Sequence, residues 1–179
     1  TLGCSITGAN LYLINPNGIV FGENATLNVS GSFYASTADY LSFESGQQLH
    51  TDINQPVNLA VSDPSSFGFL QPDPAGIIVN GGHLSVGEGQ RLGLVGGDIT
   101  IIGNNIAPAA DTGITPADTS IPANLGALSG QIELVSVNSS GEAVMSHDGM
   151  DTSSFDAMGT IIMANQAIVT ASGNAAGSI

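Results

Sequence analysis

The most informative stretch of the sequence reads Asn10-Leu11-Tyr12-Leu13-Ile14-Asn15-Pro16-Asn17-Gly18-Ile19-Val20-Phe21-Gly22. Two runs of residues that favour β-strands, 11–14 and 19–21, flank the tetrapeptide Asn15-Pro16-Asn17-Gly18. This tetrapeptide fits a type I turn. Asn at the first position accepts hydrogen bonds from the turn backbone, and Pro at the second fixes φ. Asn at the third position tolerates the backbone angles of the bridge region, and Gly at the fourth brings no steric cost. The stretch therefore predicts two short strands joined by a tight turn.

The composition extends this reading to the whole chain. The 179 residues suffice for one domain, residues 1–179, and 42% are hydrophobic, which is enough for a sizeable core. Lys and Arg together number one, Arg91, so the charged side chains that normally cover helices are missing, whereas there are 24 Gly residues. This composition predicts an all-β protein with many tight turns.

The charge balance excludes several partners. Fifteen Asp and Glu residues against the single cation give a formal net charge of −14. Nucleic acids need clustered cations, so we expect no nucleic-acid binding, and anionic membrane surfaces are disfavoured for the same reason. No stretch reaches the roughly 18 apolar residues of a membrane span, so we expect no membrane insertion. Calcium or a cationic partner surface remains compatible with the charge.

Pairs of apolar residues recur at a steady interval between residues 76 and 102. Their first members are Ile77, Leu84, Leu92 and Ile99, so successive pairs are 7, 8 and 7 residues apart. Each pair has the i, i+2 spacing of a short strand with one buried face, and three such strands make about 22 residues, one coil of a triangular parallel β-helix. A sandwich or barrel also gives many short strands, but hairpins suit such short corners less well. The first part of the chain repeats the pattern at Leu27/Val29, Phe33, Leu41/Phe43 and Leu49.

Two segments interrupt this pattern, and we expect both to leave the coils. Residues 51–75 are dense in turn residues and predict a short extra hairpin or edge strands, whereas residues 106–128 contain three prolines and predict a long loop. Residues 159–164 and 166–173 predict further coil strands, separated from earlier ones by a polar loop at 146–154. The chain begins without Met and ends without a capping segment, so we expect a fragment of a longer protein.

Residues 10–43 closely resemble the secretion domain of two-partner secretion exoproteins of the filamentous haemagglutinin type, also called the haemagglutination activity domain. The matching features are the turn at 15–18, the following residues 19–22 and the segment 31–39, Gly-Ser-Phe-Tyr-Ala-Ser-Thr-Ala-Asp. The turn alone is a weak signal, but the combined pattern is specific. The resemblance is partial at the N-terminus, because the separate NPNL motif common in the family is missing.

The resemblance implies a right-handed parallel β-helix with short extra-helical strands or a hairpin. It also implies a secretion module that the POTRA domains of a TpsB-type outer-membrane β-barrel recognise, and that seeds the β-helix of an adhesin outside the cell. The protein is then secreted or held at the cell surface, after passing the periplasm and outer membrane. The single cysteine, Cys4, allows no internal disulfide, which suits transport of an unfolded chain.

The family resemblance gives the turn residues Asn15, Pro16, Asn17 and Gly18 one of two roles. They either shape a corner of the coil or contact the transporter, and the structural role is favoured. If the domain were only a β-helical spacer, replacing the turn would change stability without a specific effect on export.

A carbohydrate- or host-surface-binding adhesin domain is the alternative function. Sugar sites generally need exposed aromatic rings, and the chain has no Trp. Tyr34 and Tyr40 are the candidate surface contacts, because the phenylalanines 21, 33 and 43 are expected in the core.

We expect no catalytic residues, no metal site and no cofactor. Enzymes with a β-helical fold cleave polysaccharides, but a calcium-assisted lyase needs a cationic base and only Arg91 is present, with Glu88 and Asp98 as expected ion-pair partners. The carboxylate pair Asp148 and Asp151, which a glycoside hydrolase would need at a defined distance, lies in a predicted polar loop.

The sequence also shows no spacing of residues that is typical of a metal site. The three histidines, 50, 83 and 147, are far apart and lack metal-ligand spacing. The acidic pairs Asp111/Asp118 and Asp148/Asp151 supply oxygen ligands that suit calcium, but no EF-hand pattern surrounds them.

Overall fold

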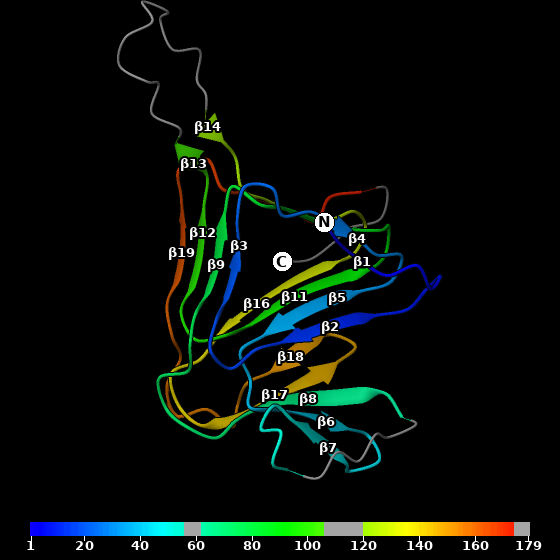
Figure 1. Cartoon of the computed structure of the whole chain (residues 1–179), viewed down its shortest axis with the longest axis vertical. Helices are drawn as coiled ribbons and strands as arrows, with labels where there is room; N and C mark the ends of the chain where they lie inside the picture. Colours follow the sequence, from blue (N-terminus) through cyan, green and yellow to red (C-terminus); the bar gives the residue numbers. More distant parts are fainter. Residues whose placement is uncertain (56–61, 106–119, 174–179) are drawn as a thin grey trace, which may run out of the picture.

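A computed structural model describes residues 1–55, 62–105 and 120–173, and the regular elements in these ranges are all β-strands. Within these ranges, no helix is long and apolar enough to cross a membrane. The strands form three parallel sheets around one core (Figure 1). Sheet I holds β2 (Leu11–Ile14), β5 (Phe33–Ser36), β11 (Arg91–Gly96) and β16 (Gln131–Ser136). Sheet II holds β3 (Ile19–Phe21), β9 (Ile77–Asn80), β12 (Ile99–Ile102) and β19 (Ile161–Ala164). Sheet III holds β10 (His83–Val86), β15 (Asn124–Ala127) and β20 (Ile168–Thr170). It is continued by β4 (Leu27–Asn28), whose preceding residue Thr26 forms a bridge with His83 of β10, and by β1 (Leu2–Gly3), which pairs with β4.

The chain winds through the three sheets in turn, so that each coil contributes one strand to each sheet. The first coil holds β2, β3 and β4, the second β5, β9 and β10, the third β11, β12 and β15, and the fourth β16, β19 and β20. Equivalent positions stack in register from coil to coil, as Leu11, Phe33, Leu92 and Ile132 do in sheet I. This is a parallel β-helix, which confirms the predicted fold class.

The core of the β-helix is built from the alternating apolar residues. The predicted strand pairs that begin at Ile77, Leu84, Leu92 and Ile99 all point inward and are buried in one cluster. In-register stacking brings the apolar side chains of successive coils together in rows along the interior. The i, i+2 pattern in the sequence therefore identified the inner face of these strands correctly.

A fourth, antiparallel sheet packs against the outer face of sheet I (Figure 1, lower part). We call it the outer sheet. It is built from two excursions that leave the same corner, between sheets I and II, in the second and fourth coils. Its strand order is β18 (Gly149–Asp151), β17 (Gly141–Ser146), β8 (Pro64–Phe69), β6 (Tyr40–Phe43) and β7 (Gln48–His50).

The outer sheet corrects three sequence-based assignments. Leu41, Phe43 and Leu49 were expected on coil strands, but they lie on β6 and β7, so the excursion starts well before residue 51. Residues 146–154 were expected as a loop, but β17 and β18 form a hairpin there. An apolar face packed on the outside of sheet I gives the same alternation of residues as a face packed inside it. This is why the sequence pattern placed Leu41, Phe43 and Leu49 on coil strands. Residues 56–61 of the segment expected to leave the coils lie outside the described residues.

The segment expected to leave the coils at residues 106–128 ends earlier than expected, before residue 124. Asn104–Asn105 (β13) pairs antiparallel with Ser120–Ile121 (β14), and residues 106–119 lie outside the described ranges. Residues 124–127, expected within the excursion, form the coil strand β15, which pairs with β10 and β20. Its inward side chains are only Leu125 and Ala127, so its apolar signal is weak.

Candidate recognition site at the first coil corner

Residues 15–18 form a tight turn between β2 and β3. The Gly18 amide donates to the Asn15 carbonyl at 3.1 Å, and the Asn17 amide donates to Asn15 Oδ1 at 3.1 Å. The Asn15 side-chain amide in turn donates to the Gly18 carbonyl at 3.0 Å. Gly18 has a φ of 102°, a left-handed conformation that side chains other than glycine rarely adopt. The Asn15 side chain thus closes the turn from both ends.

The turn is fastened to the second coil at both ends. The Asn15 amide donates to the Ser36 carbonyl at 2.9 Å, and the Ile19 amide donates to the Gly76 carbonyl at 3.2 Å. Asn15 and Asn17 are both exposed, but the Asn17 side chain, unlike that of Asn15, makes no hydrogen bond to the described part of the chain. The Asn15 side chain therefore orders the corner, whereas the Asn17 side-chain amide has no hydrogen-bond partner among the described residues.

A shallow groove adjoins the turn. It has a volume of about 400 Å³ and is lined by Pro16, Asn17, Thr37, Asp39 and residues 71–75. A second depression of about 350 Å³ shares Asp73 and Pro74 with it and extends to Asp98 at the corner of the third coil. The linings contain carboxylates but no Lys or Arg, so the electrostatic potential along this corner favours a partner with positive charge.

The same corner is made differently in each coil. The first coil uses the turn at 15–18, the second and fourth coils use the outer-sheet excursions, and the third coil passes through Gly97 and Asp98 alone. A side chain at Gly97 would overlap the Pro74 carbonyl, and the Asp98 carboxylate accepts a hydrogen bond from the Thr160 amide at 2.8 Å. Neighbouring coils are thus tied together along this edge of the β-helix.

Comparison with known protein families matches residues 2–179 to the TPS secretion domain. The chain belongs to the TPS secretion domain family. This TPS domain is the secretion module of a two-partner secretion exoprotein, which is secreted with the help of a TpsB transporter partner, and such a module is not catalytic. Neither the curated proteins nor the solved structures gave a match to the chain.

Tyr34 and Tyr40 do not offer the TPS domain exposed aromatic platforms, contrary to the sequence-based expectation. Their exposed fractions are 5% and 8%. The Tyr34 ring covers Gly93 in the apolar cluster between sheet I and the outer sheet, whereas the Tyr40 ring covers Gly68 within the outer sheet and lies beside His50. The Tyr34 ring stacks on Tyr12 with centroids 5.1 Å apart. Burial raises the pKa of Tyr40 to about 12, and the neighbouring Glu142 carboxylate adds to this rise. The aromatic basis for a carbohydrate site is therefore absent at these two positions.

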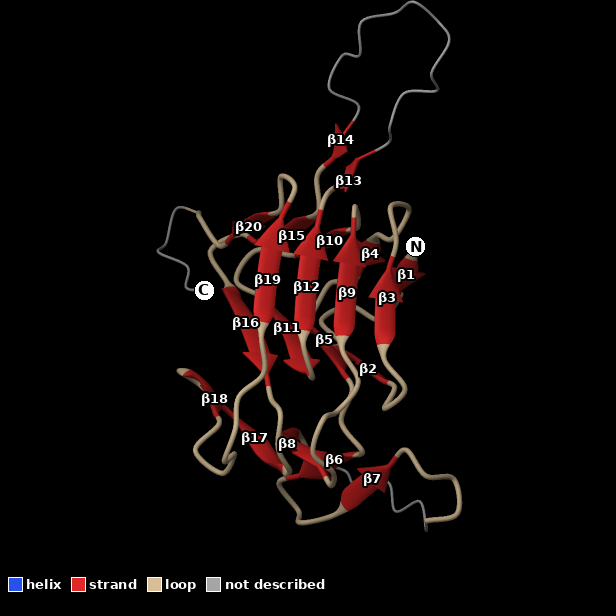
Figure 2. Ribbon diagram, turned by 90° about the vertical axis from the view of Figure 1, so that its left-hand side faces the viewer, coloured by secondary structure: helices blue, strands red, loops and turns tan. Residues whose placement is uncertain are grey.

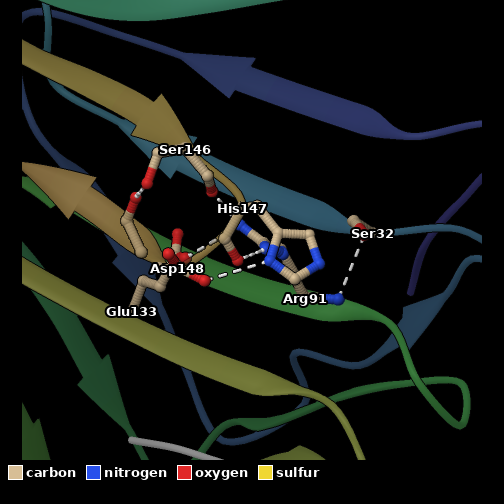
Figure 3. A network of polar contacts seen from close by, with 7 residues as sticks. Ser32, Arg91, Glu133, Ser146, His147 and Asp148 are labelled. Atoms are coloured by element: carbon tan, nitrogen blue, oxygen red, sulfur yellow. Dashed lines mark hydrogen bonds and ion pairs between the residues drawn. The ribbon is translucent and has the colours of Figure 1, made fainter.

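Arg91 contacts a different acidic residue from those expected. Its guanidinium pairs with Glu133 at 3.3 Å and donates to the carbonyls of Ser146, at 2.6 Å, and His147 (Figure 3). Burial raises the pKa of Glu133, and the Arg91 charge opposes this rise. The expected partners Glu88 and Asp98 are near in sequence, but in a β-helix the nearest side chains belong to the adjacent coil.

The described residues of the TPS domain contain no group of three or more His, Cys, Asp or Glu side chains that could hold a metal ion. Asp148 is exposed and contacts His147, and the Asp151 carboxylate accepts a hydrogen bond from the Ser153 amide at 2.8 Å, which lowers its pKa. The calcium candidates Asp111 and Asp118 lie outside the described residues.

Proposed function

We propose that the POTRA domains of the outer-membrane partner recognise this TPS domain in its unfolded form, and that the domain then folds outside the cell and seeds the following β-helix. The observation that carries the proposal is the row of apolar side chains left uncovered on the fourth coil, among the described residues. Recognition and seeding are separate steps, and the structure supports each through a different feature.

The uncovered row supports seeding. Ile99 and Ile161 occupy equivalent inward positions in β12 and β19, but the exposed fraction rises from 0% at Ile99 to 41% at Ile161. Met163, the partner of Ile101, is exposed in the same way. Figure 2 shows β19 at the edge of sheet II, where its outer backbone groups are open to a further strand. A further coil stacked on β19 would cover this row and extend the ladder of hydrogen bonds.

The use of strand edges supports recognition of the unfolded chain. Strands of the two middle coils, such as β9 and β12, are paired on both sides in the folded domain, so their edges are free only before folding. Extended apolar segments of this kind add to the exposed edge of a partner sheet, with main-chain hydrogen bonds supplying affinity. The net charge of −14 suits a partner whose surface carries positive charge.

Asn17 is the turn residue best placed to contribute a specific contact. Its side chain is exposed, whereas the Asn15 side chain is engaged in the turn itself. A contact through Asn17 would make the sequence of the turn matter for export independently of its effect on stability.

Export of the exoprotein tests the proposal. The exoprotein would be produced together with its transporter, either intact or lacking the POTRA domains, and surface exposure would be measured for the natural chain, Asn15→Ala and Asn17→Ala. We expect export to require the POTRA domains and Asn17→Ala to reduce it while the isolated domain keeps its stability. Undiminished export without the POTRA domains would contradict the proposed recognition. Unchanged export of Asn17→Ala would contradict a contact between Asn17 and the transporter.

A further inference from the structure

The outer sheet joins two segments that are distant in the chain. β6, β7 and β8 leave the second coil, and β17 leaves the fourth coil to pair with β8. The register places Glu142 opposite Gly68, Ala143 opposite Phe67 and Val144 opposite Ser66. Among the described residues, the third coil contributes no strand to the outer sheet, so the β8–β17 pair bridges across it.

Polar contacts reinforce this bridge on both sides. The Glu142 carboxylate accepts hydrogen bonds from Tyr40 Oη at 2.6 Å and from Ser66 Oγ at 3.2 Å, and so links β6, β8 and β17. Arg91, the only Lys or Arg in the chain, holds the carbonyls at the tip of the β17–β18 hairpin, Ser146 and His147 (Figure 3). The hairpin is thus fixed to the second coil by its base and to the third coil by its tip.

An apolar contact completes the bridge. Ala143 is fully buried and belongs to the same cluster as Phe67 and Phe69 of β8 and Val95 and Val135 of sheet I. Without β17, the β8 edge would lack its hydrogen-bonding partner, and one side of this cluster would face solvent. Unpaired strand edges and uncovered apolar side chains are features of incompletely folded states.

We propose that residues 141–151 act as a closing clasp, which completes the outer sheet last and commits the domain to its folded state. In a chain exported from the N-terminus, β8 emerges about 70 residues before β17, so the first three coils form around an open β8 edge. Pairing of β17 then couples the fourth coil to the second and third coils in one step. The role of the clasp in export rests on the proposed function, whereas its order of closure is a property of the chain itself.

Two neighbouring substitutions on β17 form a matched test in the full chain. Ala143→Asp places a carboxylate in the buried cluster and prevents docking of the strand, whereas Val144→Asp changes a side chain that is 41% exposed. By native-state hydrogen exchange, we expect Ala143→Asp to speed exchange of the β8 and β17 amides by about 100-fold and that of the β9 and β12 amides by less than about threefold. Equal loss of protection in all four strands, or unchanged protection in β8, would overturn the proposal.

Pulse labelling during refolding of the natural chain tests the order of closure. We expect amides of β8 and β17 to gain protection after those of β5 and β11, and simultaneous protection in one phase would contradict a late clasp.

In export, we expect Ala143→Asp to reach the surface less efficiently than Val144→Asp, and equal export would contradict the commitment step. Binding of both unfolded variants to the POTRA domains, measured alongside, separates the two ideas: absence of binding by the natural chain would refute the proposed recognition and leave the exchange result standing.

Discussion

Tyr40 donates a hydrogen bond of 2.6 Å to Glu142 although the two residues are 102 positions apart in the chain. The bond joins the excursion of the second coil to that of the fourth. Glu142→Ala would leave Tyr40 and Ser66 without their acceptor, so we expect the free energy of unfolding to fall by about 1–3 kcal/mol. Urea denaturation measures this loss. Asp148→Ala, at an exposed position of the same hairpin, serves as the control and should change stability by less than about 0.5 kcal/mol. Equal effects of the two substitutions would contradict a stabilising link between Tyr40 and Glu142.

The partly buried Tyr12 and the buried Tyr40 predict an alkaline loss of stability. Burial raises the pKa of both Tyr12 and Tyr40 to about 12, with added effects of neighbouring anionic groups, whereas an unfolded tyrosine titrates near pH 10. The folded state therefore favours the neutral phenols, and this contribution is complete below pH 10 and disappears as the pH rises from about 10 to about 12. Urea midpoints measured across this range should fall, and they should fall less in Tyr40→Phe. A Tyr40→Phe variant with the same pH profile as the natural chain would contradict the assignment.

The alternation of inner and outer positions can be tested on adjacent residues of β9. Ile77 is fully buried in the core of the β-helix, whereas Ile78 points outward with 40% exposure. Ile77→Ala removes buried methylene groups and leaves a cavity, so it should cost about 2–5 kcal/mol of unfolding free energy. Ile78→Ala should cost less than about 1 kcal/mol. Similar losses at both positions, measured by urea denaturation, would be inconsistent with the register of sheet II.

The turn at the first corner allows a similar comparison. Asn15→Ala removes two side-chain hydrogen bonds that close the turn, so it should lower stability by about 1–2 kcal/mol. Asn17→Ala removes an exposed side chain with no bond to the described residues, and its stability should stay within about 0.5 kcal/mol of the natural chain. Thermal and urea unfolding would check both values. A large loss in Asn17→Ala would mean that this side chain also supports the fold.

The sequence predicted the parts of the β-helix that depend on neighbouring residues. The turn at 15–18 follows from four adjacent residue types, and the inward pairs from Ile77 to Ile101 follow from i, i+2 spacing, so local rules were enough. The resemblance to the two-partner secretion family also predicted the coil architecture. These features need no knowledge of which distant segments meet.

The outer sheet could not be predicted in the same way. Leu41 and Phe67 alternate as core residues of a coil do, and nothing local shows that they pack on the outside of sheet I. The burial of Tyr34 and the pairing of Arg91 with Glu133 also depend on contacts between coils. Interactions between residues of different coils are set by register and excursion length, and a single sequence specifies neither directly.

Direct binding to the POTRA domains is the measurement that tests recognition most sharply. The probe is the POTRA region of the outer-membrane transporter encoded nearest to the exoprotein. Its binding is measured to the folded domain and to the domain held unfolded in denaturant until just before dilution. The Asn15→Ala and Asn17→Ala variants are measured in both forms. We expect saturable binding of the unfolded chain, weaker binding of the folded domain, and a reduced affinity for Asn17→Ala. Absence of binding by either form of the natural chain would contradict the account.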